Sequence, residues 1–259
     1  MLVRAYGRIL SASTVADQLL VELYDRRRIV AVTAYSLEQS PAAHRFAGLP
    51  SIDRFDDLEA VLALRPDLIV VNDYGDPARI ARARSAGLRV FDLGPMHGVE
   101  TFLEDARQLT RLLGVPERGE RYARRFARRI AQVAAGRAPE DRLGGLYLTV
   151  YGDRIFGGTV GSSYHDILRY GGLRDVAAGA HRGWPEYGLE ELLSLDPDLI
   201  VTKPAMGRRL CARPGLHRLR SCGGAGRILE LDAVLLDATG PGMLEAAEAV
   251  FDGAYGEGR

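Results

Sequence analysis

The chain is short of residues that mark several common classes of protein. It has one lysine, one tryptophan and two cysteines among 259 residues. The spacing of Cys211 and Cys222 suits neither a CxxC redox pair nor a four-ligand zinc site, whereas a disulfide closing a small loop and two buried free thiols both remain possible. We attribute the excess of arginine over the single Lys203 to the base composition of the gene and give it no functional weight.

Long apolar runs and an excess of one charge are also missing. No stretch approaches the roughly 18–20 apolar residues that cross a bilayer. The 34 acidic residues balance 34 basic ones, so charge gives no reason to expect a nucleic-acid partner. The first residues, MLVRAYGRILSAS, lack the apolar segment of a signal peptide. Either the protein stays in the cytoplasm or an export signal has been removed.

The motifs of common enzyme classes are absent. Gly157, Gly158 and Gly161 follow a predicted strand and precede a predicted helix, but they form neither GxGxxG nor GxxxxGK[ST]. We interpret them as a tight turn or as backbone beside a ligand. There is no GxSxG elbow, and the five histidines form no HExxH pair. Nothing positive therefore indicates an enzyme, and we expect no cofactor and no resident metal.

One segment of the sequence occurs twice. Residues 57–70 read DLEAVLALRPDLIV and residues 188–201 read GLEELLSLDPDLIV, with nine of fourteen positions identical. Each copy has apolar residues at helical spacing, then Pro-Asp, then a short Leu/Ile/Val run, which predicts helix, turn and buried strand. Because the copies lie half the chain apart, they indicate two similarly built α/β halves. Two lobes imply a cleft, and a cleft usually binds a small molecule.

The first half alternates predicted strands and helices, which is typical of a mostly parallel sheet covered on both faces. Thr14 and Asp57 are plausible helix N-caps and Gly87 a plausible C-cap. The predicted strands are 8–12, 29–33, 68–72 and 89–93. The predicted helices are 14–24, 57–64, 77–86 and 99–113.

A long arginine-rich helix over 117–135 is predicted to join the halves. A basic helix is compatible with a membrane or nucleic-acid surface, but its narrow apolar stripe favours a solvated strut between lobes. The second half has predicted strands 146–151, 198–201 and 228–231 and helices 163–170, 188–195, 216–219 and 241–254. We predict an N-terminal lobe over 1–115, a connecting helix over 116–138 and a C-terminal lobe over 139–259.

Seven segments in order carry a family likeness: GRILSASTVADQLL, RIVAVTAYS, DLEAVLALRPDLIV, GLRVFDLG, GSSYHDILRYGGLRDV, WPEYGLEELLSLDPDLIV and LLDATGPGMLEAAEAV. With the long helix between the halves, the chain resembles the substrate-binding proteins of ABC importers for vitamin B12, ferric siderophores and haem. The resemblance implies a class III periplasmic-binding-protein-like fold, with two Rossmann-like lobes of mostly parallel sheets joined by a single long backbone helix.

The resemblance also implies a docking role for two glutamates. In that family an acidic residue at the start of the repeated helix in each lobe contacts arginines of the permease, and the matching positions here are Glu59 and Glu190. A glutamate in the first turn also stabilises a helix through the helix dipole, by about 0.3–1 kcal/mol. The two roles are compatible.

The same resemblance implies a ligand between the lobes, against loops that follow the strands. Trp184 stands in a Trp-Pro context similar to that of the B12 binders, although a core position is the alternative. At 51–55 the chain reads SIDRF where B12 binders carry a first-lobe tryptophan, and the tyrosine of many haem binders is absent there too. The candidate ligand-binding residues are Tyr35, Asp53, Arg54, Phe55, Tyr74, Tyr151, Arg182, Trp184 and Arg208.

We therefore predict a monomeric solute-binding protein that captures a metal chelate, a ferric siderophore or a corrinoid, and delivers it to ABC permease subunits. Arg54, Arg182 and Arg208 suit an anionic siderophore through bidentate hydrogen bonds. The resemblance implies a periplasmic or exported protein, or a cytoplasmic one if the native gene lacks a signal. The alternatives are a two-domain Rossmann-like transferase and a binder of a bare transition-metal ion.

Overall fold

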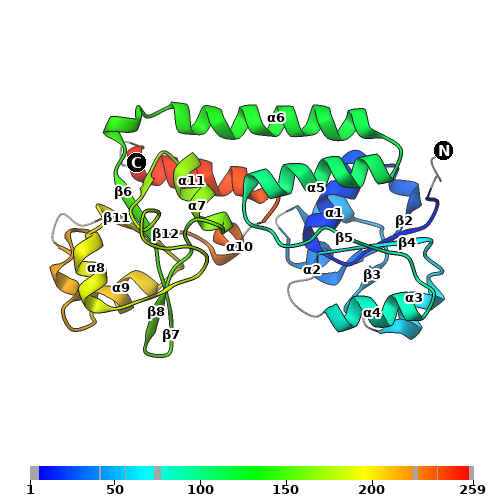
Figure 1. The fold of residues 1–259 in the computed structure, drawn as a ribbon, viewed down its shortest axis with the longest axis horizontal. Coiled ribbons are helices and arrows are strands. Elements are labelled where there is room, and N and C mark those ends of the chain that lie inside the picture. Colours follow the sequence, from blue (N-terminus) through cyan, green and yellow to red (C-terminus); the bar gives the residue numbers. More distant parts are fainter. Residues whose placement is uncertain are drawn as a thin grey trace. The chain divides into compact units, whose positions relative to one another are not determined.

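The computed structural model describes residues 6–40, 42–55, 57–72, 77–223, 227–237 and 239–256. They fall into two compact units (Figure 1). Unit 1 takes in 1–95 and 103–124, and unit 2 takes in 96–102 and 125–259. Among the described residues, every helix is too short or too polar to span a bilayer.

Unit 1 is built on a parallel sheet with the strand order β3-β2-β1-β4-β5. Every residue of β4 is buried, as expected for a parallel strand covered on both faces. The strands are β1 (Ile9–Ser11), β2 (Ile29–Thr33), β3 (Ser51–Ile52), β4 (Leu68–Val71) and β5 (Val90–Asp92). The helices are α1 (Thr14–Leu23), α2 (Ala34–Glu38), α3 (Leu58–Ala63) and α4 (Pro77–Ser85), with 3-10 turns η1 (Arg26–Arg28) and η2 (Ala43–Phe46).

Unit 2 contains a parallel sheet with the order β12-β11-β6-β9 and a separate antiparallel sheet with the order β10-β8-β7. In Figure 1, β7 and β8 project from the body of unit 2 as a hairpin. The parallel strands are β6 (Gly144–Tyr147), β9 (Arg174–Asp175), β11 (Leu199–Thr202) and β12 (Arg227–Glu230). The antiparallel strands are β7 (Thr149–Tyr151), β8 (Arg154–Phe156) and β10 (Glu186–Tyr187).

Seven helices and three 3-10 turns complete the described part of the chain. α7 and α11 pack against each other in unit 2. α5 (Val99–Leu112) and α6 (Pro116–Ala135) each contribute residues to both units. The other helices are α7 (Ser163–Tyr170), α8 (Leu189–Leu195), α9 (Met206–Cys211), α10 (Ala233–Leu236) and α11 (Gly242–Tyr255), and the turns are η3 (Pro139–Asp141), η4 (Leu216–Arg218) and η5 (Arg220–Cys222).

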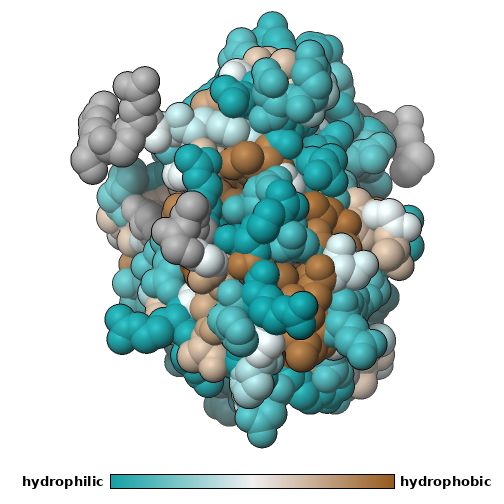
Figure 2. Space-filling model, turned by 90° about the vertical axis from the view of Figure 1, so that its left-hand side faces the viewer, coloured by the Kyte–Doolittle hydropathy of each residue, from teal (hydrophilic) through white to brown (hydrophobic). Residues whose placement is uncertain are grey.

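On the face shown in Figure 2, hydrophobic patches lie among hydrophilic side chains.

The long helix α6 is amphipathic, as the sequence predicts. Phe126 and Ile130 are buried, whereas Arg121 and Arg128 are exposed. Glu120 accepts hydrogen bonds from both Arg107 and Arg124. The basic residues therefore form a solvated face on a helix that is anchored along its apolar side.

The two copies of the repeat have the same structure. In each copy a helix leads into a strand: α3 into β4, and α8 into β11. β4 pairs in parallel with β1, and β11 pairs in parallel with β6. The aspartate of each Pro-Asp accepts a backbone N–H at the start of that first strand: Asp67 from Gly7 and Asp198 from Gly144, each at 2.7 Å. The residue before each Pro-Asp, Arg65 or Asp196, has a positive φ although it is not glycine. The repeat thus preserves the turn geometry as well as the hydrophobic pattern.

The prediction of an α/β fold with parallel sheets and a long helix is confirmed, and several local predictions are wrong. The predicted strand 146–151 divides into β6 and β7 because the chain leaves the parallel sheet to enter the antiparallel one. The predicted helix 216–219 is the 3-10 turn η4. Ser13, not Thr14, caps α1 through its side chain, while Asp57 caps α3 as predicted. No pattern in the sequence predicted α2.

The two cysteines are joined. Cys211 at the end of α9 and Cys222 at the end of η5 form a disulfide, with Cα atoms 5.4 Å apart. This outcome resolves the two possibilities that the spacing allowed. A disulfide is typical of an oxidising compartment.

A buried carboxyl group on α5 makes stability depend on pH. Asp105 is buried, and its Oδ2 has no hydrogen-bond partner among the described residues. Burial, with smaller effects of Glu104 and Asp92, raises the pKa of Asp105 from its usual 3.8 to about 7. Between these two pKa values the folded carboxyl keeps a proton that the unfolded chain has lost. The free energy of unfolding therefore falls as the pH rises from 3.8 to about 7.

We expect Asp105→Asn to raise the melting temperature at pH 8 by a few degrees and to raise it by less at pH 5. The asparagine stays neutral at both pH values. The unfolded aspartate is already ionised at pH 5, whereas the folded one ionises only near pH 7, so the cost of burying Asp105 grows between pH 5 and pH 7. Each kcal/mol corresponds to about 2–4 °C for a chain of this size. Calorimetry at both pH values checks the result, and an equal shift at pH 5 and pH 8 would contradict it.

Candidate functional site

The carboxyl ends of the parallel strands in unit 2 bring several polar and aromatic side chains to one edge. β6 ends at Tyr147, and β11 is followed directly by Lys203. Asp237 follows α10, the helix that comes after β12, and Tyr164 lies in the first turn of α7. Ligands of open α/β sheets bind at this edge. It is the candidate functional site of unit 2.

Three aromatic rings at this edge form what we call the aromatic cluster. The rings of Tyr147 and Tyr164 stack with their centroids 4.0 Å apart and their planes 17° apart. The centroid of Trp184 lies 5.9 Å from that of Tyr147 and 5.2 Å from that of Tyr164. Tyr147 is 1% exposed, but Trp184 keeps 40% of its surface exposed. An indole that is supported by packed rings and open to solvent suits stacking on a flat ligand.

Two glycines allow the aromatic cluster to pack this closely. A Cβ atom at Gly158 would lie 2.4 Å from the ring of Tyr164, and one at Gly157 would lie 2.1 Å from the carbonyl oxygen of Tyr147. Any larger residue would displace one of the two tyrosines. The glycine-rich segment, whose pattern excludes a phosphate loop, therefore shapes the aromatic cluster.

A chain of hydrogen bonds continues from the aromatic cluster. Tyr164 donates its hydroxyl to Asp237 Oδ1 at 2.6 Å, and Lys203 Nζ donates to Asp237 Oδ2 at 2.6 Å. Burial, followed by the neighbouring Tyr147 and the bond to Asp237, raises the pKa of Tyr164 far above its usual value. Burial likewise raises the pKa of Tyr147. Both phenols are therefore neutral, and Tyr164 acts as a hydrogen-bond donor.

Three other predicted ligand residues of the second unit lie outside the aromatic cluster. Tyr151 ends β7 on the hairpin, is 57% exposed, and packs edge-on to Phe156 with centroids 6.0 Å apart. Arg182 is exposed close to Trp184 in the sequence. Arg208 is exposed on α9. The structure therefore places Trp184, alone among these four predicted and described side chains, in ring contact with Tyr147 and Tyr164.

In unit 1 the predicted residues also follow strands. Tyr35 lies on α2 directly after β2 and is 41% exposed. Asp53, Arg54 and Phe55 follow β3; the first two are exposed, while Phe55 packs partly against the hydrophobic core of unit 1. Tyr74 lies outside the described residues. Phe55 therefore has a structural role in addition to the proposed ligand contact.

Sequence reasoning missed three residues at this edge: Tyr147, Tyr164 and Asp237. The two tyrosines had a usable signal, because Tyr147 lies in a predicted strand and Tyr164 opens a predicted helix. Lys203 was within reach of the same argument, because the loop 203–208 follows a predicted strand. The position of Asp237 follows only from a contact across 73 residues with Tyr164.

The two glutamates of the predicted permease contact occupy matching positions. Glu59 lies in the first turn of α3 and Glu190 in the first turn of α8, and both are exposed. A negative charge near a helix N-terminus is stabilising, so both carboxylates stabilise their own helices. Exposure also leaves them accessible to a partner.

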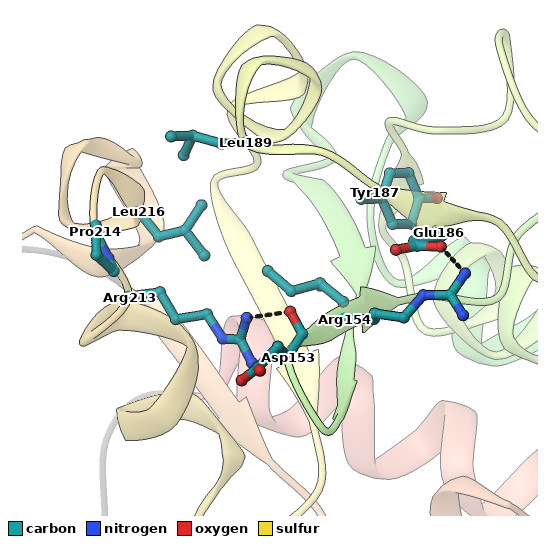
Figure 3. Close-up of a pocket in the computed structure, with 9 residues that line it drawn as sticks. Asp153, Arg154, Glu186, Tyr187, Leu189, Arg213, Pro214 and Leu216 are labelled. Carbon is teal, nitrogen blue, oxygen red and sulfur yellow. Dashed lines mark hydrogen bonds and ion pairs between the residues drawn. The ribbon is translucent and has the colours of Figure 1, made fainter.

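A separate pocket lies beside α8 (Figure 3). It has a volume of about 230 Å³ and is lined by both charged and apolar side chains. Arg213 donates to the carbonyl oxygens of Gly152 and Asp153 at 3.0 and 2.7 Å, and Arg154 pairs with Glu186. Even drug-sized ligands typically occupy larger pockets, so this one is too small for a corrinoid or a haem.

Two histidines of unit 2 are bound to carboxylates. His165 Nδ1 lies 2.7 Å from Asp175 Oδ2, which also accepts the hydroxyl of Thr159 at 2.7 Å. His181 Nε2 lies 2.5 Å from Glu191 Oε1. Over the part of the chain that the structure describes, no three His, Cys, Asp or Glu side chains are grouped to hold a metal ion.

Comparison with known families decides the class of protein. A family model described as "Periplasmic binding protein" matches residues 9–219, which is most of the chain. The chain belongs to this family of periplasmic binding proteins. This family is one of binding proteins and not of enzymes, which argues against the transferase alternative.

Two curated relatives are similar over most of the chain. A cobalamin-binding protein of Halobacterium salinarum is 24% identical over 200 residues, which cover 75% of this chain and 53% of that protein. A vitamin B12-binding protein of Salmonella typhi is 25% identical over 185 residues, covering 70% of this chain and 67% of that protein. The chain thus matches about half the length of the first relative and two thirds of the second.

Solved structures have the same fold. A periplasmic heme-binding protein from Pseudomonas aeruginosa is 27% identical with a TM-score of 0.71, covering 95% of this chain and 92% of that one. A possible iron-binding, periplasmic solute-binding protein from Staphylococcus epidermidis is 14% identical with a TM-score of 0.84, covering 97% and 100%. These likenesses agree with the periplasmic-binding-protein fold described above.

Proposed function

We propose that this periplasmic binding protein captures a corrinoid and delivers it to the permease of an ABC importer. The observation that carries the proposal is the aromatic cluster at the carboxyl edge of the unit 2 sheet, where Trp184 is 40% exposed and supported by two tyrosine rings. A corrin ring is broad and has apolar faces. Stacking on a rigid aromatic surface buries a large area of such a ring at little entropic cost.

The choice of a corrinoid over haem rests on two points. The Halobacterium and Salmonella relatives are named for binding cobalamin and vitamin B12. In addition, Tyr164 donates its hydroxyl to Asp237, so a ferric haem would have to break that hydrogen bond to bind this phenol. The aromatic cluster therefore favours stacking over coordination of a metal.

The remaining parts of the proposal follow the family. We propose Glu59 and Glu190 as the contacts to the permease, and Tyr35, Tyr151 and the segment 53–55 as further ligand contacts. The Cys211–Cys222 disulfide supports an exported protein, since oxidising compartments favour such bonds.

A thermal-shift panel tests the proposal. Purified protein is melted with cyanocobalamin, haemin, a ferric hydroxamate siderophore and a ferric catecholate siderophore. We expect cyanocobalamin to raise the melting temperature saturably, by about 5–10 °C at a hundred times the Kd, because it binds only the folded state. Stabilisation by haemin or by a siderophore alone would reject the corrinoid and retain the family.

A further inference from the structure

A charged pair lies at the phenol end of the aromatic cluster. Lys203, the only lysine in the chain, donates to Asp237 Oδ2 at 2.6 Å. The side chain of Lys203 is 20% exposed and that of Asp237 is 45% exposed. Tyr164 joins this pair to the aromatic cluster, because its ring contacts Trp184 and its hydroxyl donates to Asp237. A flat ligand stacked on Trp184 therefore has its rim near the charged pair.

The backbone around Lys203 is held in place. Glu230 accepts the backbone N–H groups of Ala205 and Gly207 at 3.0 and 2.9 Å. The carbonyl oxygen of Lys203 accepts the N–H of Met206 at 3.1 Å. Ala205 has a positive φ of 63°, so these bonds stabilise a turn that its own backbone preference opposes. Lys203 thus projects from a fixed turn instead of a loose loop.

Both members of the pair can form hydrogen bonds in addition to those that they make within the described residues, Lys203 as a donor and Asp237 as an acceptor. An ammonium group has three donor hydrogens, and Lys203 uses one of them on Asp237. Each oxygen of Asp237 accepts one bond from a protein side chain, and a carboxylate has about four acceptor sites. The pair therefore offers donors and acceptors side by side to a group at the ligand rim.

The two classes of tetrapyrrole differ in what they bring to this pair. The rim of a corrinoid such as cobinamide carries primary amides, which donate and accept at the same time. The rim of a haem or of a corrinoid acid carries carboxylates, which only accept and which add negative charge beside Asp237. Because Asp237 already neutralises Lys203, an incoming carboxylate gains little from the ammonium.

Resting on the function proposed above, we propose that the Lys203–Asp237 pair selects corrinoids with amide rims over tetrapyrroles with carboxylate rims. Asp237 provides the discrimination by repelling a carboxylate, and Lys203 limits that repulsion while binding the amide oxygen. The pair acts as a specificity determinant at the edge of the aromatic cluster.

Two matched probes test this proposal: dicyanocobinamide, whose rim carries amides, and dicyanocobyrinic acid, whose rim carries carboxylates. Isothermal titration at pH 7.5 gives the ratio of their Kd values for the wild type, Asp237→Asn and Lys203→Met. Glu248→Gln is the control, because it removes a carboxylate from an exposed ion pair between α6 and α11.

We expect the wild type to prefer dicyanocobinamide by at least tenfold. Asp237→Asn should reduce this preference about tenfold, since Lys203 becomes free to pair with a ligand carboxylate. Lys203→Met should increase the preference several-fold, because Asp237 then repels the carboxylate without compensation. The control should leave the ratio unchanged. Opposite shifts from the two partners of one ion pair are not expected from a purely structural role.

The possible failures are distinguishable. If the wild type binds both corrinoids and neither variant moves the ratio, or both move it in the same direction, the selectivity proposal is wrong while the proposed function stands. If the folded wild type binds neither corrinoid, the proposed function is wrong and the selectivity proposal is rejected with it. Melting curves of all variants establish that they are folded.

Discussion

Replacing Trp184 with alanine is expected to weaken cyanocobalamin binding about 100-fold. Truncating an aromatic hot spot at the centre of an interface typically costs about 2–4 kcal/mol, and a loss of about 3 kcal/mol corresponds to a factor of about 100 in Kd. Trp184 is the most exposed residue of the aromatic cluster, so its truncation removes more contact with the ligand than with the protein. Isothermal titration of the variant against the wild type measures the effect.

Two further variants show whether stacking is the cause. Trp184→Phe retains a ring at the same place and should lose less than about tenfold in affinity. Tyr151→Ala removes an exposed ring from the hairpin outside the aromatic cluster and should lose less than Trp184→Ala. Equal losses in Trp184→Ala and Trp184→Phe, or an unchanged Kd in Trp184→Ala, would rule out the indole as the main contact.

Reversing both docking charges is expected to abolish delivery without affecting capture. In the double variant Glu59→Arg and Glu190→Arg, two exposed carboxylates become cations, which repel a basic permease surface. We expect ligand uptake into proteoliposomes that contain the cognate permease to fall at least tenfold. The Kd for cyanocobalamin should stay within about twofold of the wild type, since neither residue belongs to the aromatic cluster.

The matched control for this experiment is Glu117→Arg. Glu117 is also an exposed glutamate in the first turn of a helix, α6, so its replacement removes a similar helix-dipole contribution of about 0.3–1 kcal/mol. The control should transport like the wild type. Equal transport losses in the control and the double variant would show that the glutamates serve helix stability only.

The repeated segment made most of the fold predictable from sequence. Its Leu/Ile/Val runs are long enough and apolar enough to specify buried parallel strands, and β4 and β11 are buried at every position. The failures are local. β3, β9 and β10 are too short for a periodic pattern, and β7 and β8 depend on a turn at Gly152, where φ is positive.

The candidate site was only partly predictable. Trp184 was found because one tryptophan in a Trp-Pro context is conspicuous. Its partners Tyr147 and Tyr164 belong to other elements, β6 and α7, and their contacts with the indole arise from strand order, not from local pattern. The pairing of Lys203 with Asp237 was missed for the same reason, because an ion pair across 34 residues leaves no periodic signal.

Isothermal titration of the purified chain with cyanocobalamin tests the central claim most directly. We predict saturable binding of one cyanocobalamin per chain with a Kd below about 1 μM, together with quenching of Trp184 fluorescence at the same stoichiometry. The absence of binding by folded protein at about 100 μM cyanocobalamin, with saturable binding of haemin or a ferric siderophore in the same buffer, would contradict a corrinoid cargo.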